Sequence, residues 1–221
     1  ARVGNEFILI FRRAMFDLVE GGSSYEEILQ LGLALCEAGV SIMNTGIGWH
    51  EAQIPTIATK VPRAAFTWVT AKFRDQLPVP VVTSNRINTP EVAEDILSRG
   101  DADMVSMARP LLADAEFVIK AEQNRADEIN TCIACNQACL DHVFNGQLTS
   151  CLVNPRACYE LDLNIEVSET KKNIAVIGAG PAGLAAAVTA AQRGHNVSLF
   201  DSAETIGGQF NLAKRIPGKE E

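Results

Sequence analysis

The chain has 221 residues, 47% of them apolar, and a formal net charge of −8 at pH 7. The apolar share is enough for packed cores and argues against disorder. The acidic balance without a basic cluster disfavours a nucleic-acid or acidic-membrane surface. No apolar run reaches the roughly 18 to 20 residues of a membrane span, and the first residues carry no signal-peptide pattern. Cysteines are scarce before residue 130, so we expect a reducing, cytoplasmic location rather than a disulfide scaffold.

Residues 1–121 alternate between short β-rich runs and helix-like stretches. The β-rich runs are 7–11, 40–44, 79–83 and 104–107, and the helix-like stretches are 24–39, 62–77, 89–100 and 110–122. This alternation predicts an α/β fold with a parallel sheet and crossover helices. A doubly wound sheet and a (β/α)8 barrel both fit. We favour the C-terminal half of a barrel, because polar residues follow each run and would meet at the face where barrels place their active sites.

Three arginines, Arg12, Arg86 and Arg109, each follow one of these runs. Three guanidinium groups at one rim suit an anionic ligand, and the last strands of a barrel commonly bind phosphate. The alternative is solvated surface charge. His50, in TGIGWHEAQIP, also follows a run and could deliver a proton near neutral pH, although a lone histidine is more often structural.

Residues 122–170 contain four closely spaced cysteines in the pattern C-x2-C-x3-C-x11-C, namely Cys132, Cys135, Cys139 and Cys151. A tight first trio and a fourth thiolate favour an iron–sulfur cluster. Zinc is less favoured, because its ribbons use two C-x2-C pairs, and a site without metal is least favoured. We expect Cys36 and Cys158 to be ordinary small residues.

Residues 171–221 begin with a strand, a glycine turn, an Ala-rich helix and a second strand. Gly178, Gly180 and Gly183 fit G-x-G-x-x-G, and Asp201 closes the second strand. This context predicts a dinucleotide site, with phosphate at the helix N-terminus and ribose at the acidic residue. The downstream GGQ resembles flavoprotein reductases with two dinucleotide domains, which favours FAD over NAD. The cofactor-binding candidates are Gly178, Gly180, Ala182, Gly183, Asp201 and Gln209.

The segments TGIGWHEAQIPTIAT, SNRIN, DILSRGDADMVSMARP, NTCIACNQACLD, TSCLVNPRAC and GGQFNLAKRIPGKEE carry a family resemblance. The whole chain resembles the bacterial 2,4-dienoyl-CoA reductases, iron–sulfur flavoenzymes of the old yellow enzyme group. The resemblance implies an FMN-bearing barrel, a [4Fe–4S] cluster and an FAD- and NADPH-binding module. It also implies electron flow from NADPH through FAD, the cluster and FMN to the dienoyl thioester in unsaturated fatty acid β-oxidation.

The resemblance assigns roles by position. Arg12 would contact the FMN ring, and Arg86 with Ala108 and Arg109 would bind the FMN phosphate. His50 would protonate the substrate together with a tyrosine of an earlier strand that this chain lacks. The cluster ligands would be Cys132, Cys135, Cys139 and Cys151.

Two positions depart from the family pattern. Arg13 stands where the resemblance predicts an apolar residue, and Ala134 where it predicts glycine. Neither departure removes a group with an assigned role.

The chain opens without methionine and closes after a glycine-rich turn, so we expect an internal piece of a longer protein, inactive by itself. We divide it into a half-barrel at 1–121, a cluster segment and linker at 122–170, and the start of an FAD domain at 171–221. One alternative is another enzyme of this architecture, an amine dehydrogenase or ene-reductase. A more distant one is a non-catalytic electron carrier or a zinc-stabilised protein. The sequence does not indicate an oligomeric state.

Overall fold

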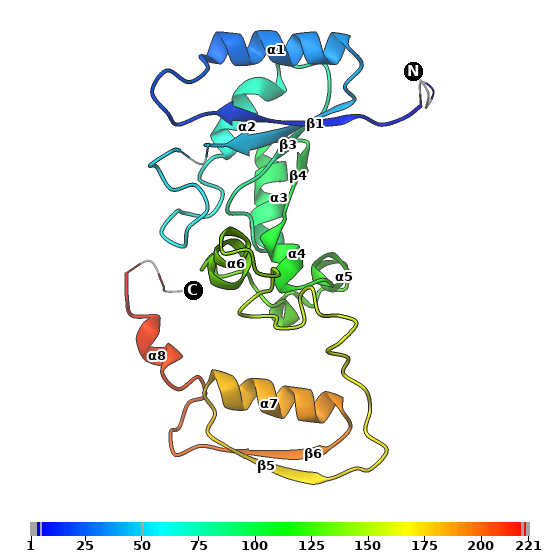
Figure 1. Ribbon diagram of the computed structural model, residues 1–221, viewed down its shortest axis with the longest axis vertical. Coiled ribbons are helices and arrows are strands. Elements are labelled where there is room, and N and C mark those ends of the chain that lie inside the picture. The colour runs from blue at the N-terminus through cyan, green and yellow to red at the C-terminus, as the bar shows by residue number, and fades with distance from the viewer. Residues whose placement is uncertain (1–3, 5, 50, 218, 220–221) are drawn as a thin grey trace. The chain divides into compact units, whose positions relative to one another are not determined.

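The computed structural model describes residues 4, 6–49, 51–217 and 219, and it divides into two compact units, Ala1–Ala157 and Cys158–Glu221 (Figure 1). The division falls inside the segment predicted at 122–170, so the finer three-part division stays a prediction. None of the helices in the described residues has the length and apolar character to cross a membrane.

The first unit contains a four-stranded parallel sheet. Its strands are β1 (Ile10–Phe16), β2 (Ile42–Ile47), β3 (Val81–Thr83) and β4 (Met104–Val105), and they pair in the order β1-β2-β3-β4. A doubly wound sheet reverses its strand order at a switch point, whereas each strand here lies beside its predecessor, as in a barrel. The α/β prediction is therefore confirmed, and the sequential order favours the barrel alternative.

The first helices of this unit begin and end largely where local signals place them. They are α1 (Tyr25–Glu37), α2 (Thr67–Arg74), α3 (Pro90–Arg99), α4 (Arg109–Ala113) and α5 (Phe117–Glu122). Ser24 and Glu27 form a capping box at α1, which satisfies backbone N–H groups that the helix cannot pair. Thr89 caps α3 and Gly100 ends it in the left-handed conformation at φ 74°, which glycine adopts without penalty.

Helices α1 and α2 cover the sheet through one apolar core (Figure 1). Met43 and Val81 of the strands have no exposed surface, and Phe73 of α2 is 2% exposed. The core consists of Met15, Ile28, Met43, Ile47, Val69, Phe73, Leu77 and Val81. This packing fixes the strands whose carboxyl ends carry the candidate residues.

The predicted first strand was misplaced. The run at 7–11 is exposed, with Phe7 at 54% and Ile8 at 63%, and the strand that pairs with β2 begins only at Ile10. Arg12 therefore lies within β1, opposite Asn44, and not after the strand. Pairing with the neighbouring strand, which apolar content does not reveal, decides where a strand lies.

The predicted helix at 110–122 is also interrupted. Asp114 has an extended backbone at φ −147° and ψ 107° and separates α4 from α5. Its side chain is 5% exposed and accepts a hydrogen bond from Glu116 N at 3.0 Å. An aspartate that bonds to the backbone two residues ahead favours a turn over a continuous helix.

The cysteine segment follows α5 and contains only short elements. These are η1 (Ala126–Glu128), the π-helical turn η2 (Gln137–Asp141) and α6 (His142–Phe144). In the second unit, β5 (Asn173–Ile177) and β6 (Asn196–Phe200) are parallel, α7 (Pro181–Gln192) connects them, and α8 (Phe210–Ala213) follows. This strand–helix–strand unit confirms the predicted order of elements around the glycine turn.

Candidate functional site

A cavity of about 360 Å³ lies where β3 and β4 end. Its lining includes all four residues that the sequence assigned to FMN, Arg12, Arg86, Ala108 and Arg109. We call it the arginine pocket. Its volume is within the range of small-molecule sites, and three guanidinium groups give it strong positive charge.

Arg86 and Arg109 are fixed in this pocket by main-chain carbonyls. Arg86 is 7% exposed, and its Nε donates to Val61 O at 2.7 Å. Arg109 Nη1 donates to Ile57 O at 2.9 Å and to Asn136 Oδ1 at 2.6 Å. Both arginines therefore contact the segment after β2, and Arg109 also contacts the cysteine segment. Such preorganised guanidinium groups can bind an anion without first ordering their long side chains.

All four predicted cysteine ligands line a second, smaller cavity of about 20 Å³, which we call the cysteine pocket. Burial raises the pKa of the Cys151 thiol, and negative charge on Cys132 and Cys135 raises it further, against hydrogen bonds from the backbone of Val153 and Asn154. All four thiols line one cavity, and Cys151 lies close enough to Cys132 and Cys135 for charge on them to raise its pKa. Thiolates gathered in this way need a positive partner, which a metal centre supplies.

Within the described residues, no three His, Cys, Asp or Glu side chains are grouped so as to hold a single metal ion. A four-iron cluster does not require three side chains around one ion, because each of its cysteines bonds a different iron atom. Four thiols around one cavity provide one cysteine for each iron of such a cluster.

The two pockets share a wall, because Cys132 and Arg109 line both. The loop that forms this wall is bonded to side chains from the barrel end. Asn88 Nδ2 donates to Cys132 O at 2.8 Å, and Thr59 Oγ1 donates to Ile133 O at 2.8 Å. Ala134 has φ 52°, a left-handed conformation that glycine adopts at lower cost. The left-handed backbone is thus a physical reason for the glycine that the resemblance predicts at this position.

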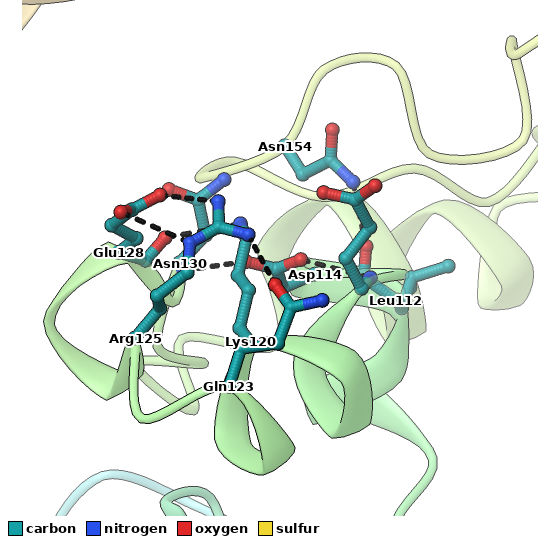
Figure 2. A network of polar contacts seen from close by, with 9 residues as sticks. Leu112, Asp114, Lys120, Gln123, Arg125, Glu128, Asn130 and Asn154 are labelled. Carbon is teal, nitrogen blue, oxygen red and sulfur yellow. Dashed lines mark hydrogen bonds and ion pairs between the residues drawn. The ribbon is translucent and has the colours of Figure 1, made fainter.

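Asn130 and Asn154, which flank the four cysteines, are bonded to the break after α4 and to α4 itself (Figure 2). Asn130 N donates to Asp114 Oδ2 at 2.9 Å, and Asn154 Nδ2 donates to Leu112 O at 3.0 Å. Lys120 Nζ donates to Asp114 Oδ2 at 2.7 Å. Burial acts to raise the pKa of Asp114, but the hydrogen bonds donated to its carboxylate outweigh burial, and the pKa is lowered.

His50 lies outside the described residues, so its predicted position at the strand end stays a prediction. Its neighbour Trp49 donates its Nε1–H to Asp17 Oδ1 at 2.8 Å. Asp17 is 4% exposed and also accepts from Ser23 N at 2.8 Å. The chain on the N-terminal side of His50 is thus bonded to the end of β1.

The glycine turn of the second unit has the geometry that the G-x-G-x-x-G pattern requires. Gly178 has φ 101°, and a Cβ added to Gly183 would lie 1.8 Å from Gly178 O. Gly183 therefore permits the close approach of turn and helix. Gly180 is the N-cap of α7, and Ala182 lies exposed in its first turn. The helix N-terminus thus presents unpaired backbone N–H groups suited to phosphate.

The Asp201 carboxylate is bonded to this turn. It accepts from Ala179 N at 2.6 Å and from Ala203 N at 2.7 Å, and these hydrogen bonds lower its pKa. Each oxygen retains a second lone pair that could accept from a ribose hydroxyl. Gly207 N donates to Ala179 O at 2.7 Å, and Gln209, two residues later, is the N-cap of α8. The downstream GGQ is therefore folded against the glycine turn.

Residues 1–128 match the NADH:flavin oxidoreductase / NADH oxidase family, and residues 176–219 match the NAD(P)-binding Rossmann-like domain. The chain belongs to the NADH:flavin oxidoreductase / NADH oxidase family. The coarser predictions of an oxidoreductase fold with FMN- and NAD(P)-binding parts are thereby confirmed.

Relatives in this flavin oxidoreductase family carry out different reactions. The chain is 41% identical to a metal reductase of Desulforamulus reducens, over 99% of the chain and 33% of that protein. A structure of 2-naphthoyl-CoA reductase with 2-naphthoyl-CoA is similar at TM-score 0.94 and 33% identity, covering 99% of the chain and 34% of that protein. Histamine dehydrogenase from Rhizobium sp. 4-9 is similar at TM-score 0.83 and 25% identity, covering 96% and 31%. The chain thus spans about a third of the length of these flavin enzymes.

Three bonded side chains near the predicted site were missed from the sequence, Thr59, Asn88 and Asp114. The side chain of each forms a hydrogen bond with a main-chain atom of the cysteine segment. Asn88 lies inside SNRIN, one of the segments that carry the family resemblance. That segment was the one signal that could have drawn attention to it.

Proposed function

We propose that this chain is part of an enzyme that reduces 2,4-dienoyl-CoA thioesters to enoyl-CoA with NADPH. The observation that carries the proposal is the shared wall between the arginine pocket and the cysteine pocket. A flavin site directly beside a cluster site suits a reaction in which electrons arrive singly and leave as a pair. FMN, FAD and a [4Fe–4S] cluster supply that electron route when bound.

The residues of the arginine pocket suit FMN. Arg86 and Arg109 are bonded at the ends of β3 and β4, where barrels commonly bind phosphate. Arg12 is an exposed side chain on β1, and its positive charge would stabilise negative charge on the flavin ring. In this assignment the phosphate and the ring are bound by different arginines of one pocket.

The four cysteines would bind the cluster, with Cys132 on the side of the arginine pocket. FAD is proposed for the glycine turn, through Gly178, Gly180, Ala182, Gly183, Asp201 and Gln209. NADPH would bind as a cosubstrate, and its site is not assigned to residues of this chain.

Two observations support a thioester substrate. The segment TGIGWHEAQIP resembles the dienoyl-CoA reductases, and 2-naphthoyl-CoA reductase, a structural relative, is named for an acyl-CoA with conjugated double bonds. Reduction of a conjugated dienoyl thioester adds a hydride at one carbon and a proton at another. His50 is proposed as a proton donor, so His50→Ala should slow thioester reduction and leave FMN bound, and unchanged turnover would remove it from the mechanism.

An amine dehydrogenase is the second candidate, because the structural similarity extends to histamine dehydrogenase. Amine oxidation delivers electrons to the flavin and releases a proton, whereas thioester reduction consumes both. The direction of electron flow therefore separates the two candidates.

The deciding measurement is NADPH oxidation by the anaerobically purified full-length protein, with and without a 2,4-dienoyl-CoA. NADH replaces NADPH in a parallel assay, because the family description names NADH. We expect oxidation that depends on the thioester, with loss of the dienoyl absorbance. Oxidation of the nicotinamide that does not depend on the thioester would overturn the substrate assignment. Amine-dependent reduction of an added electron acceptor would favour the second candidate.

A further inference from the structure

Asn88 occupies the boundary between the two pockets. It follows β3, is 3% exposed and lines the arginine pocket. Its Nδ2 donates to Cys132 O at 2.8 Å, across 44 positions of sequence. Asn88 is therefore a direct polar contact between the flavin side and the first cysteine of the cluster motif.

The orientation of the Asn88 amide follows from this bond. A main-chain carbonyl can only accept, so the nitrogen must face Cys132 and the oxygen must face away from it. Asn88 Oδ1 is buried and has no hydrogen-bond partner among the described residues. Asn44 Oδ1 has the same status, but Asn44 lies on β2 and does not line the pocket.

A buried acceptor without a donor is costly, and a ligand in the arginine pocket could remove the cost by donating to it. A phosphate oxygen mainly accepts at neutral pH, so phosphate is not that donor. Hydroxyl and N–H groups can donate to Asn88 Oδ1. FMN carries several hydroxyls on the chain between its ring and its phosphate.

We propose that Asn88 is a positioning residue that links the two pockets, with Oδ1 accepting from a hydroxyl of the bound flavin while Nδ2 fixes the Cys132 carbonyl. The inference rests on the proposed FMN site but not on the proposed thioester. The bond to Cys132 already orients the Asn88 amide, so a flavin hydroxyl that donates to Oδ1 is connected through this one amide to the Cys132 peptide.

Other hydrogen bonds restrain the loop after Cys132, so a substitution at Asn88 should have only a local effect on it. Thr59 Oγ1 bonds Ile133 O and Ala134 O, and Arg109 bonds Asn136 Oδ1. The residues after Cys132 are therefore restrained independently of Asn88. A change at Asn88 should move the Cys132 peptide without releasing the other cysteines.

The test uses the full-length protein freed of FMN but retaining its iron. FMN is titrated by the quenching of its fluorescence, and the dithionite-reduced cluster is observed by electron paramagnetic resonance with and without FMN. Asn88→Ala should weaken FMN binding about tenfold, the effect of one lost buried hydrogen bond. FMN should change the cluster spectrum of the wild type and leave that of Asn88→Ala unchanged, with iron content retained in both.

Asn145→Ala is the matched control. Asn145 is an exposed asparagine of the cysteine segment whose Nδ2 also donates to a carbonyl, Asp141 O at 2.8 Å. Its FMN affinity and FMN-dependent spectrum should equal those of the wild type. Equal effects of Asn88→Ala and Asn145→Ala would overturn the inference.

A second variant, Asn88→Asp, separates the two bonds. It keeps an acceptor oxygen for the flavin and loses the donor to Cys132, so it should bind FMN more tightly than Asn88→Ala yet lack the FMN-dependent spectrum. If both variants unfold, as seen by circular dichroism, Asn88 belongs to the fold and the inference is wrong. A wild type that binds no flavin overturns this inference and the proposed function together. A wild type that binds FMN but does not reduce the thioester overturns the substrate alone.

Discussion

Asp114→Asn is expected to loosen the start of the cysteine segment. The Asp114 carboxylate is 5% exposed and accepts from Lys120 Nζ, Asn130 N and Glu116 N at 2.7, 2.9 and 3.0 Å. Figure 2 shows Lys120 and Asn130 directed toward Asp114. The amide of asparagine replaces one acceptor oxygen by a donor and removes the charge opposite Lys120, so the three bonds cannot all persist.

The expected cost is about 3 kcal/mol, the lower end of the range for a buried ion pair that loses one partner. Two features keep it at the lower end. Lys120 is 13% exposed, and its Nζ also donates to Glu128 O at 3.1 Å, so the ammonium group retains a partner and some water.

Amide hydrogen exchange in a peptide that spans Asn130 reports this change directly, because the Asn130 N–H is one of the donors. If local opening limits exchange, a loss of about 3 kcal/mol makes it roughly a hundredfold faster. Glu128→Gln is the control, since the Arg125–Glu128 pair nearby is solvent-exposed, and exposed pairs contribute little. Exchange at Asn130 that is equally fast in wild type, Asp114→Asn and Glu128→Gln would refute the reasoning.

The same bonds predict a pH dependence. Burial opposes ionisation of Asp114, but the donors from Lys120, Asn130 and Glu116 outweigh it, so the folded-state pKa is below the unfolded value. The stabilisation is therefore complete above the unfolded pKa of about 3.9 and is lost as the pH falls through the lower, folded pKa. Protection at Asn130, corrected for intrinsic exchange, should decline only below about pH 4. The Asp114→Asn variant should lack that step.

Three further changes test the remaining parts of the chain. Gly183→Ala should abolish FAD retention, because its Cβ would lie 1.8 Å from Gly178 O; FAD released from the purified variant in wild-type amount would contradict this. Cys139→Ser should lose iron and acid-labile sulfide while Cys158→Ser, at an exposed cysteine, retains them, and equal iron contents would argue against the ligand assignment. Ala134→Gly should raise the free energy of unfolding by roughly 0.5 kcal/mol, because the strain relieved at φ 52° exceeds the entropy cost of glycine. Slower iron loss to a chelator would report that gain, and faster loss would contradict it.

Features of the fold that depend on neighbours in sequence were predictable. The cap at Thr89, the stop at Gly100 and the turn at Gly178 each follow from a residue type and its immediate context. The alternation of runs predicted the parallel sheet for the same reason. The start of β1 was not predictable, because its limits depend on pairing with β2 and not on the apolar content of residues 7–11.

The candidate site divides in the same way. Arg86 and Arg109 were predicted to meet because the carboxyl ends of parallel strands share one edge, and the arginine pocket contains both. The contacts that shape the loop between the pockets were not predictable. Thr59 and Asn88 donate to main-chain carbonyls 74 and 44 positions away, and a carbonyl is present at every residue, so no side-chain pattern marks the partner.

The cysteine spacing by itself therefore underdetermines the site. Four thiols separated by two, three and eleven residues can approach one another only if the chain between them is shaped, and here much of the shaping comes from outside the segment. Asp114 and Leu112 bond its two ends, and Asn88 and Thr59 bond its first loop. Because Asn88 also lines the arginine pocket, the groups that form one pocket help to form the other. Substitutions at the barrel end should consequently alter the cysteine loop even where every thiol is intact.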